Sequence, residues 1–202
     1  MATETRYDPT TALVVVDVQH DFAHPDGSLT VPGADGVVAV ANREVAAAEA
    51  AGATVAYTQD WHPPSTPHFV TEGGTWPVHC VAGTWGAELV GTLVVRGPVV
   101  RKGTGGEDGY SGFTVRDPRS GAEHPTELAG LLREAGVERL VVVGLATDYC
   151  VKETVLDALR EGLATTVLTE GVAPVDLEPG DGERALAAMA EAGAEVVGGA
   201  TP

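Results

Sequence analysis

The amino-acid sequence predicts an α/β fold, doubly wound in three layers around a mostly parallel central sheet. Short Val-rich apolar runs recur along the 202 residues, and amphipathic stretches rich in Ala, Leu and Glu lie between most of them. Nearly uninterrupted apolar runs are typical of strands buried on both faces of a parallel sheet. Each amphipathic stretch ends in a glycine and is followed within a few residues by an apolar run. That order indicates helices that connect parallel strands by right-handed crossovers.

The apolar runs are the expected strands. In chain order they cover residues 12–18, 53–58, 93–100, 140–145 and 164–168, with a weaker run at 195–197. The amphipathic stretches are the expected helices, and they cover residues 36–51, 126–135, 148–161 and 182–192. A glycine at the end of a helix suits the left-handed position that closes it. The glycines in question are Gly52, Gly136, Gly162 and Gly193.

Two segments lack a regular pattern and are expected to be functional loops. Residues 61–86 are rich in proline and histidine, and residues 103–121 are rich in glycine. Loops of this length inside a compact domain are more often functional than incidental. No linker or shift in composition divides the chain, so we expect a single domain over residues 1–202.

Composition excludes several classes of partner. With 29 acidic and 12 basic side chains the net charge is −17, which argues against nucleic acids and anionic membrane surfaces. Two cysteines are too few for a disulfide framework and indicate a reducing compartment. The N-terminus lacks the apolar segment of a signal peptide, and no apolar run is long enough to span a bilayer. We therefore expect a cytoplasmic protein that acts on a small molecule, with homo-oligomerisation left open.

Reactive side chains fall near the carboxyl ends of the expected strands, where ligands bind in an open α/β sheet. Asp17 lies at the end of the first apolar run, Lys102 follows the third, and Cys150 follows the fourth after a short turn. An acid and a lysine beside a thiol supply the base and the cation that a cysteine nucleophile needs. The sequence therefore predicts a catalytic trio, with a plain ion pair between Asp17 and Lys102 as the alternative.

Cys150 stands where a strand becomes a helix. The positive end of a helix dipole lowers the pKa of a thiol and favours the thiolate. Free backbone N–H groups at the same place can receive an oxyanion. The alternative is a buried structural cysteine, which is our interpretation of Cys80.

A metal site is predicted after the second strand. Asp60 and His62 point the same way in an extended segment, so they can share one ion. His68 and His79 follow in the same proline-rich loop. A carboxylate with imidazoles suits zinc, with iron(II) or manganese as alternatives, and we expect one divalent transition metal per chain. Unrelated surface histidines are the competing interpretation.

Aromatic residues near these positions are candidates for the wall of a flat ligand pocket. They are Phe22, Trp76, Tyr110 and Tyr149. Ordinary core packing accounts equally well for each of them alone.

Together these motifs resemble the nicotinamidase/pyrazinamidase branch of the isochorismatase-like cysteine hydrolases. The resemblance covers residues 12–175. The segments that carry it are Asp-Val-Gln-His-Asp-Phe at residues 17–22, Asp-Trp-His at 60–62, Trp-Pro-Val-His at 76–79, Lys102, and Gly-Leu-Ala-Thr-Asp-Tyr-Cys at 144–150. Two features depart from the pattern: Tyr149 is often a different residue, and the acidic loop at 103–109 is slightly longer than usual.

The resemblance implies a role for each of these residues. The triad would be Asp17, Lys102 and Cys150, and the metal ligands would be Asp60, His62 and His79, with His68 as a further ligand in some members. A cis peptide between Leu145 and Ala146 would turn the Ala146 N–H toward the oxyanion, beside that of Cys150. Phe22 and Trp76 would line the site for the substrate ring.

The activity that the resemblance implies is hydrolysis of nicotinamide to nicotinate and ammonia, and of pyrazinamide likewise, through a thioester. The nearest alternative is a related cysteine hydrolase that cleaves a carbamoyl or ureido amide. A non-catalytic ligand-binding member of the fold is the alternative of a different class.

Overall fold

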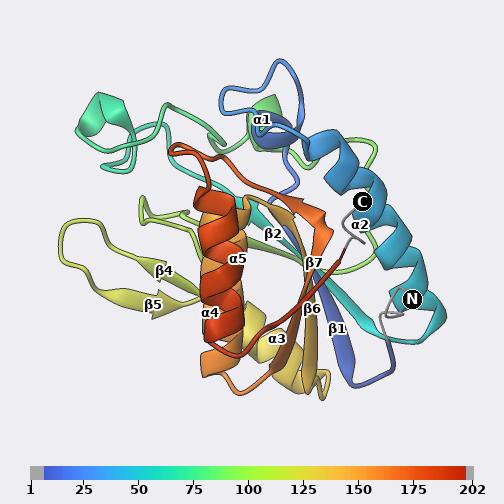
Figure 1. Cartoon of the computed structure of the whole chain (residues 1–202). Helices are drawn as coiled ribbons and strands as arrows, with labels where there is room; N and C mark the ends of the chain where they lie inside the picture. The colour runs from blue at the N-terminus through green and yellow to red at the C-terminus, as the bar shows by residue number, and fades with distance from the viewer. Residues whose placement is uncertain (1–6, 199–202) are drawn as a thin grey trace.

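The chain folds around a six-stranded sheet. The computed structural model describes residues 7–198, and the central strands lie in the order β3-β2-β1-β6-β7-β8 (Figure 1). Every neighbouring pair in this sheet is parallel, so the predicted fold class is confirmed. The strands are β1 (Thr11–Val16), β2 (Thr54–Asp60), β3 (Val99–Lys102), β6 (Arg139–Leu145), β7 (Ala164–Ala173) and β8 (Glu195–Val197).

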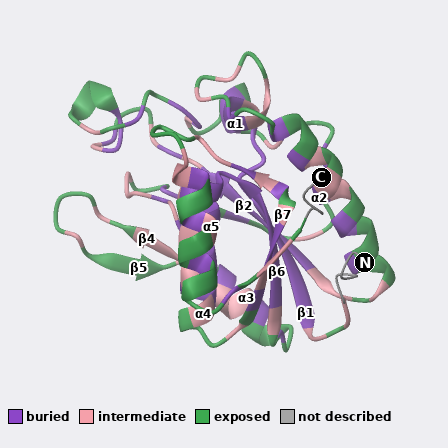
Figure 2. Ribbon diagram, in the orientation of Figure 1, coloured by how far each residue is buried: buried purple, intermediate pink, exposed green. Residues whose placement is uncertain are grey.

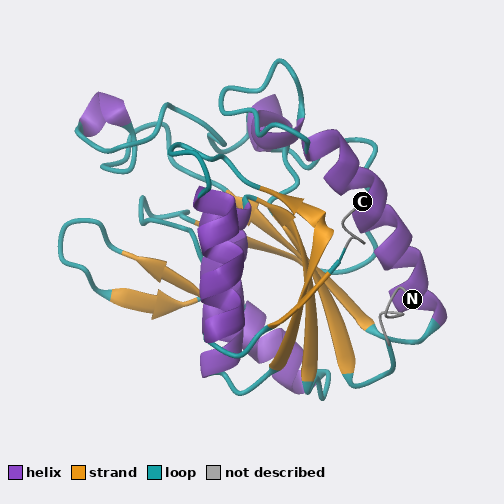
Figure 3. Cartoon of the chain, in the orientation of Figure 1, coloured by secondary structure: helices purple, strands orange, loops and turns teal. Residues whose placement is uncertain are grey.

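Helices cover both faces of the sheet (Figure 3). Helix α2 (Ala34–Ala50) packs on one face, while α3 (Leu128–Glu134), α4 (Lys152–Arg160) and α5 (Asp181–Glu191) contribute to the core on the other. All residues of β1 are buried, and they alternate between the two cores. Figure 2 shows these buried strands between helices with exposed outer faces. Burial on both faces explains why the strands are continuous apolar runs in the sequence.

The glycines predicted to end helices adopt left-handed backbone conformations. Gly52, Gly136, Gly162 and Gly193 have φ values of 70°, 69°, 84° and 109°. Each lies just beyond the last helical residue of its helix. Glycine takes this conformation without the steric cost that a Cβ imposes.

The third predicted strand is wrong over most of its length. Only Val99 and Val100 of the run at 93–100 belong to β3. The preceding segment is outside the sheet, with Val94 and Val95 37% and 39% exposed. Its backbone bonds to two side chains. The Tyr57 hydroxyl donates to the Val94 carbonyl at 2.8 Å and accepts from the Arg96 N–H at 3.2 Å, and the Val94 N–H donates to Oδ1 of Asn42 at 2.7 Å. An apolar run that is held outside the sheet by side chains cannot be distinguished from a strand by its pattern.

The glycine-rich loop at 103–121 contains a strand that the sequence analysis missed. Strand β4 (Thr114–Arg116) pairs antiparallel with β5 (Glu123–Pro125), and this hairpin projects from the body of the protein (Figure 1). All of β5 is exposed, so no alternation of apolar and polar residues reveals it. A single helical turn, α1 (His20–Ala23), was also missed, whereas residues 61–86 contain only the short 3₁₀ turns η1 (Val70–Glu72) and η2 (Trp85–Ala87).

The loops that follow the strands gather at one edge of the sheet, at the top of Figure 3. This is the edge where the carboxyl ends of β1, β2, β3 and β6 meet. None of the helices in residues 7–198 has the length and hydrophobicity needed to cross a bilayer.

Candidate active site

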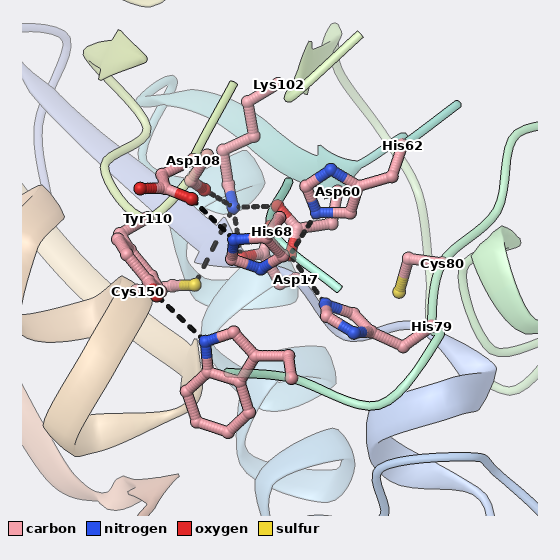
Figure 4. Close-up of polar contacts among 12 residues, drawn as sticks. Asp17, Asp60, His62, His68, His79, Cys80, Lys102, Asp108, Tyr110 and Cys150 are labelled. Carbon is pink, nitrogen blue, oxygen red and sulfur yellow. Dashed lines mark hydrogen bonds and ion pairs between the residues drawn. The ribbon is translucent and has the colours of Figure 1, made fainter. Parts of the chain in front are cut away.

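The predicted trio meets at the carboxyl edge of the sheet (Figure 4). Asp17 follows β1 and Lys102 ends β3, and both side chains are fully buried. The Lys102 ammonium Nζ lies 2.7 Å from Oδ2 of Asp17 and 3.7 Å from Sγ of Cys150. The structure therefore brings together the three side chains that the sequence predicted to lie at one edge of the sheet.

Lys102 is surrounded by acceptors. Besides Asp17, its Nζ donates to Oδ1 of Asp60 and to the Gly109 carbonyl. Burial by itself lowers the pKa of Lys102, but the carboxylates of Asp17 and Asp60 outweigh it and raise that pKa well above its usual value. The lysine is thus a permanent cation, and it needs these partners because an unpaired buried charge is costly.

The pKa of the Asp17 carboxyl group is raised toward neutral pH. Burial raises its pKa to about 6, against the lowering influence of the Lys102 ammonium. The Thr58 hydroxyl donates to Oδ1 of Asp17 at 2.7 Å. A carboxyl group with a pKa near the working pH is suited to take up and return a proton.

Cys150 lies in a π-helical turn, η3 (Thr147–Val151), that directly follows β6, and it is 7% exposed. The expectation that the helix terminus lowers its pKa is wrong. Burial raises the pKa of the Cys150 thiol well above its usual value, and the nearby Lys102 only partly opposes this. The residue is therefore a thiol at rest, and its proton must be removed. Asp17 is in place for this, since the ligand atoms of Asp17, Asp60 and Cys150 all lie within 4.8 Å of one another.

The four residues expected at the metal site also come together. Ring nitrogens of His62, His68 and His79 lie within 4.8 Å of one another, and all three residues are buried. Oδ2 of Asp60 faces this cluster, 3.7 Å from Nε2 of His62 and 3.9 Å from Nε2 of His79. Three imidazoles and a carboxylate from residues 60–79 therefore converge.

Their hydrogen bonding fits a bound cation. Nδ1 of His79 lies 2.7 Å from the Pro77 carbonyl, which leaves Nε2 facing the cluster. Both ring nitrogens of His62 are buried and, among the described residues, have no hydrogen-bond partner. Burial lowers the pKa of His79 to about 4, so its ring stays neutral, which is the form that binds metal. Buried nitrogens without partners need an explanation, and a zinc, iron or manganese ion supplies one.

One pocket is lined by both Cys150 and two members of the histidine cluster, His68 and His79. Its wall includes all the predicted aromatic residues, Phe22, Trp76, Tyr110 and Tyr149. The Trp76 indole donates to the Tyr110 hydroxyl at 2.8 Å, and its ring packs edge-on against Tyr149 at 4.7 Å between centroids. Ala146 also lines the pocket, and the peptide bond that precedes it is cis, as the resemblance implies.

The sequence analysis missed residues that hold Asp60 in place or complete the pocket wall. The Gln19 side chain clamps Asp60 across neighbouring strand ends: its Nε2 donates to the Asp60 carbonyl at 2.7 Å and its Oε1 accepts from the Asp60 N–H at 2.8 Å. Leu29, Val31 and Val175 complete the pocket wall. The position of Gln19, two residues after Asp17, was the one available signal.

Comparison with known proteins identifies the family. The Isochorismatase domain profile matches residues 11–201. The chain belongs to the isochorismatase family. Among the similar members of this family, the nicotinamidase of Escherichia coli (strain K12) is 38% identical over 204 residues, covering 92% of this chain and 93% of the relative.

Solved structures that are similar to this chain agree with the family assignment. The pyrazinamidase of Pyrococcus horikoshii in complex with zinc has a TM-score of 0.83 and 39% identity, over 95% of this chain and 100% of that one. PnC1 of L. infantum in complex with nicotinate has a TM-score of 0.85 and 34% identity, over 96% of both chains. Within the isochorismatase family, the chain is an amidohydrolase of the nicotinamidase/pyrazinamidase type.

Proposed function

We propose that the chain is a metal-dependent cysteine amidohydrolase that converts nicotinamide to nicotinate and ammonia, and pyrazinamide likewise, through a thioester. The observation that carries this proposal is that Cys150 and members of the histidine cluster line the same pocket. Nicotinate in the similar L. infantum structure supports the choice of substrate. The direct test is ammonia release from nicotinamide by purified, metal-loaded protein; release from carbamoyl or ureido amides alone would contradict it.

In the first half of the proposed reaction, Asp17 takes the thiol proton while Sγ of Cys150 attacks the amide carbon. The backbone N–H groups of Ala146 and Cys150 hold the tetrahedral oxyanion. The protonated Asp17 then gives its proton to the leaving nitrogen. The C–N bond breaks, ammonia leaves, and the acyl group remains on sulfur.

In the second half, water attacks the thioester carbon and Asp17 again takes the proton. The C–S bond breaks, Asp17 returns its proton to the Cys150 sulfur, and the new carboxylic acid gives its proton to solvent and leaves as nicotinate. Lys102 supplies a fixed positive charge beside both Asp17 and Cys150, which stabilises the carboxylate and the thiolate in turn.

Asp60, His62, His68 and His79 would hold the divalent metal, with zinc favoured because it is present in the similar P. horikoshii structure. When bound by these residues, the metal would supply a Lewis acid for the pyridine nitrogen of the substrate and so orient the ring. The aromatic wall of the pocket would then sandwich the ring and exclude water.

Purified protein is expected to contain about one transition metal per chain, and His79→Ala is expected to lose most of it. Each lost ligand weakens a metal site strongly because few ligands remain. His124→Ala is the matched control, since His124 is exposed on β5, away from the cluster. Elemental analysis after dialysis measures the content, and equal metal in wild type and His79→Ala would contradict the assignment.

The acid limb of the pH profile is expected to follow Asp17. Because burial raises its pKa to about 6, kcat/KM should fall by about tenfold per pH unit below that value as the base becomes protonated. Thr58→Val removes a hydrogen bond that stabilises the carboxylate, so the limb should move to higher pH. Profiles recorded with metal in excess measure both effects. Constant kcat/KM down to pH values well below 6 would remove Asp17 from the role of base.

A further inference from the structure

Asp108 was not among the predicted site residues, yet its carboxylate touches the histidine cluster (Figure 4). Its Oδ1 lies 2.6 Å from Nδ1 of His68. The His68 side chain is 4% exposed and that of Asp108 is 23% exposed. His79 uses a backbone carbonyl at its Nδ1, and His62 has no hydrogen-bond partner among the described residues. Of the three histidines in this part of the chain, His68 is therefore the one whose ring is held by another side chain.

We propose that Asp108 is a positioning residue that orients His68 toward the metal; this rests on the proposed metal site. A carboxylate accepts hydrogen bonds, so Nδ1 of His68 is the nitrogen that carries the proton. Nε2 then keeps its lone pair as the nitrogen that can bind the cation. The negative charge also makes the ring a stronger ligand, as in other carboxylate–histidine–metal arrangements.

The backbone around Asp108 is built to hold the carboxylate still. The Asp108 N–H donates to the Arg116 carbonyl at 2.7 Å, and the Arg116 N–H donates back at 3.0 Å. These bonds attach Asp108 to the hairpin of β4 and β5. A ligand-orienting group must itself be fixed to within a fraction of an ångström, and the hairpin provides that support.

The loop that carries His68 is fixed to the same segment. The Thr66 hydroxyl donates to the Gly106 carbonyl at 2.7 Å and accepts from the His68 N–H at 3.2 Å. The two long loops predicted from the sequence therefore meet at adjacent points, Thr66 with Gly106 and His68 with Asp108. We infer that the acidic loop at 103–109 serves to bring His68 into the metal site.

Zinc affinity, measured by competition with a chromogenic chelator, tests this. Asp108→Ala should weaken binding by about 10- to 100-fold, because Asp60, His62 and His79 remain. Asp108→Asn should lose less, since its amide oxygen still accepts from Nδ1. Glu107→Gln is the matched control: the Glu107 carboxylate accepts from the Gly105 N–H within the loop, so its affinity should equal that of wild type. The visible spectrum of the cobalt-loaded protein should change in Asp108→Ala and not in Glu107→Gln.

A double-mutant cycle shows whether Asp108 acts through His68. In a His68→Ala background, Asp108→Ala should cause no further loss of affinity. Wild-type affinity in Asp108→Ala, or an equal loss in both backgrounds, would overturn the inference while leaving the metal site intact. Absence of zinc binding by the wild type would instead overturn the metal site itself, and the inference with it. The unfolding midpoints of the metal-free proteins check that each variant folds. If Asp108→Ala does not fold, the zinc affinity of Asp108→Asn is measured in its place.

Discussion

Cys150→Ala is expected to lose kcat for nicotinamide on the order of 10⁶-fold, because in the proposed mechanism Cys150 forms the covalent intermediate. Cys150 is the pocket-lining thiol that lies beside Lys102. Cys80→Ala is the matched control, since Cys80 is also buried but its Sγ lies near the Gly86 carbonyl, outside the pocket wall. Ammonia release under saturating substrate measures both variants, and Cys80→Ala should keep nearly full activity.

Comparison of Cys150→Ala with the wild type separates the chemical step from substrate binding. Calorimetric titration should show that metal-loaded Cys150→Ala still binds nicotinamide, because the aromatic wall and the histidine cluster are unchanged. Mass spectrometry of acid-quenched wild-type enzyme should detect an acyl adduct that the variant lacks. More than a few per cent of wild-type turnover in Cys150→Ala would show that another group is the nucleophile.

Nicotinamide is expected to be hydrolysed at least about a hundredfold faster, in kcat/KM, than benzamide, a difference of about 2.7 kcal/mol. Benzamide has the same shape and the same amide but lacks the ring nitrogen. A site built around one polar contact rejects an analogue that lacks it by up to about 10⁴–10⁵-fold. Water kept on the proposed metal in place of the ring nitrogen would reduce this discrimination, which is why we expect the lower bound.

His62→Ala provides the control for this comparison. His62 is buried behind the pocket, and neither of its ring nitrogens has a hydrogen-bond partner among the described residues. Loss of the metal in this variant should make both substrates similarly poor, because the advantage of nicotinamide lies in the metal contact. If the wild-type enzyme hydrolyses benzamide within tenfold of nicotinamide, the ring nitrogen is not bound by metal.

The buried part of the fold was the part that the sequence could predict. Strand β6 begins one residue before the run at 140–145, and β2 begins one residue after the start of the run at 53–58. These strands are buried or packed by helices, so their patterns carry the signal. The hairpin of β4 and β5 is exposed and has no such pattern. The segment before β3 has the apolar pattern of a strand, but its backbone bonds to the Tyr57 side chain.

Some residues of the candidate site could likewise be predicted from the sequence, and others could not. Asp17, Lys102 and Cys150 could be placed together because the ends of parallel strands share one edge. Asp108 and His68 are separated by 40 residues, and only the folded loops bring them into contact. The pKa of Cys150 was predicted in the wrong direction because the helix terminus was considered and burial was not.

The two carboxylate oxygens of Asp60 have different partners. One oxygen faces Lys102, and the other faces His62 and His79. The charged trio and the proposed metal centre are consequently coupled through Asp60, because removing its carboxylate takes a contact from each of them. A lineage that discarded the metal by losing its histidines would keep a buried oxygen with nothing to bind, and would have to find a new partner for it. An engineer who wanted a metal-free enzyme on this scaffold would therefore begin by redesigning Asp60 rather than the histidines.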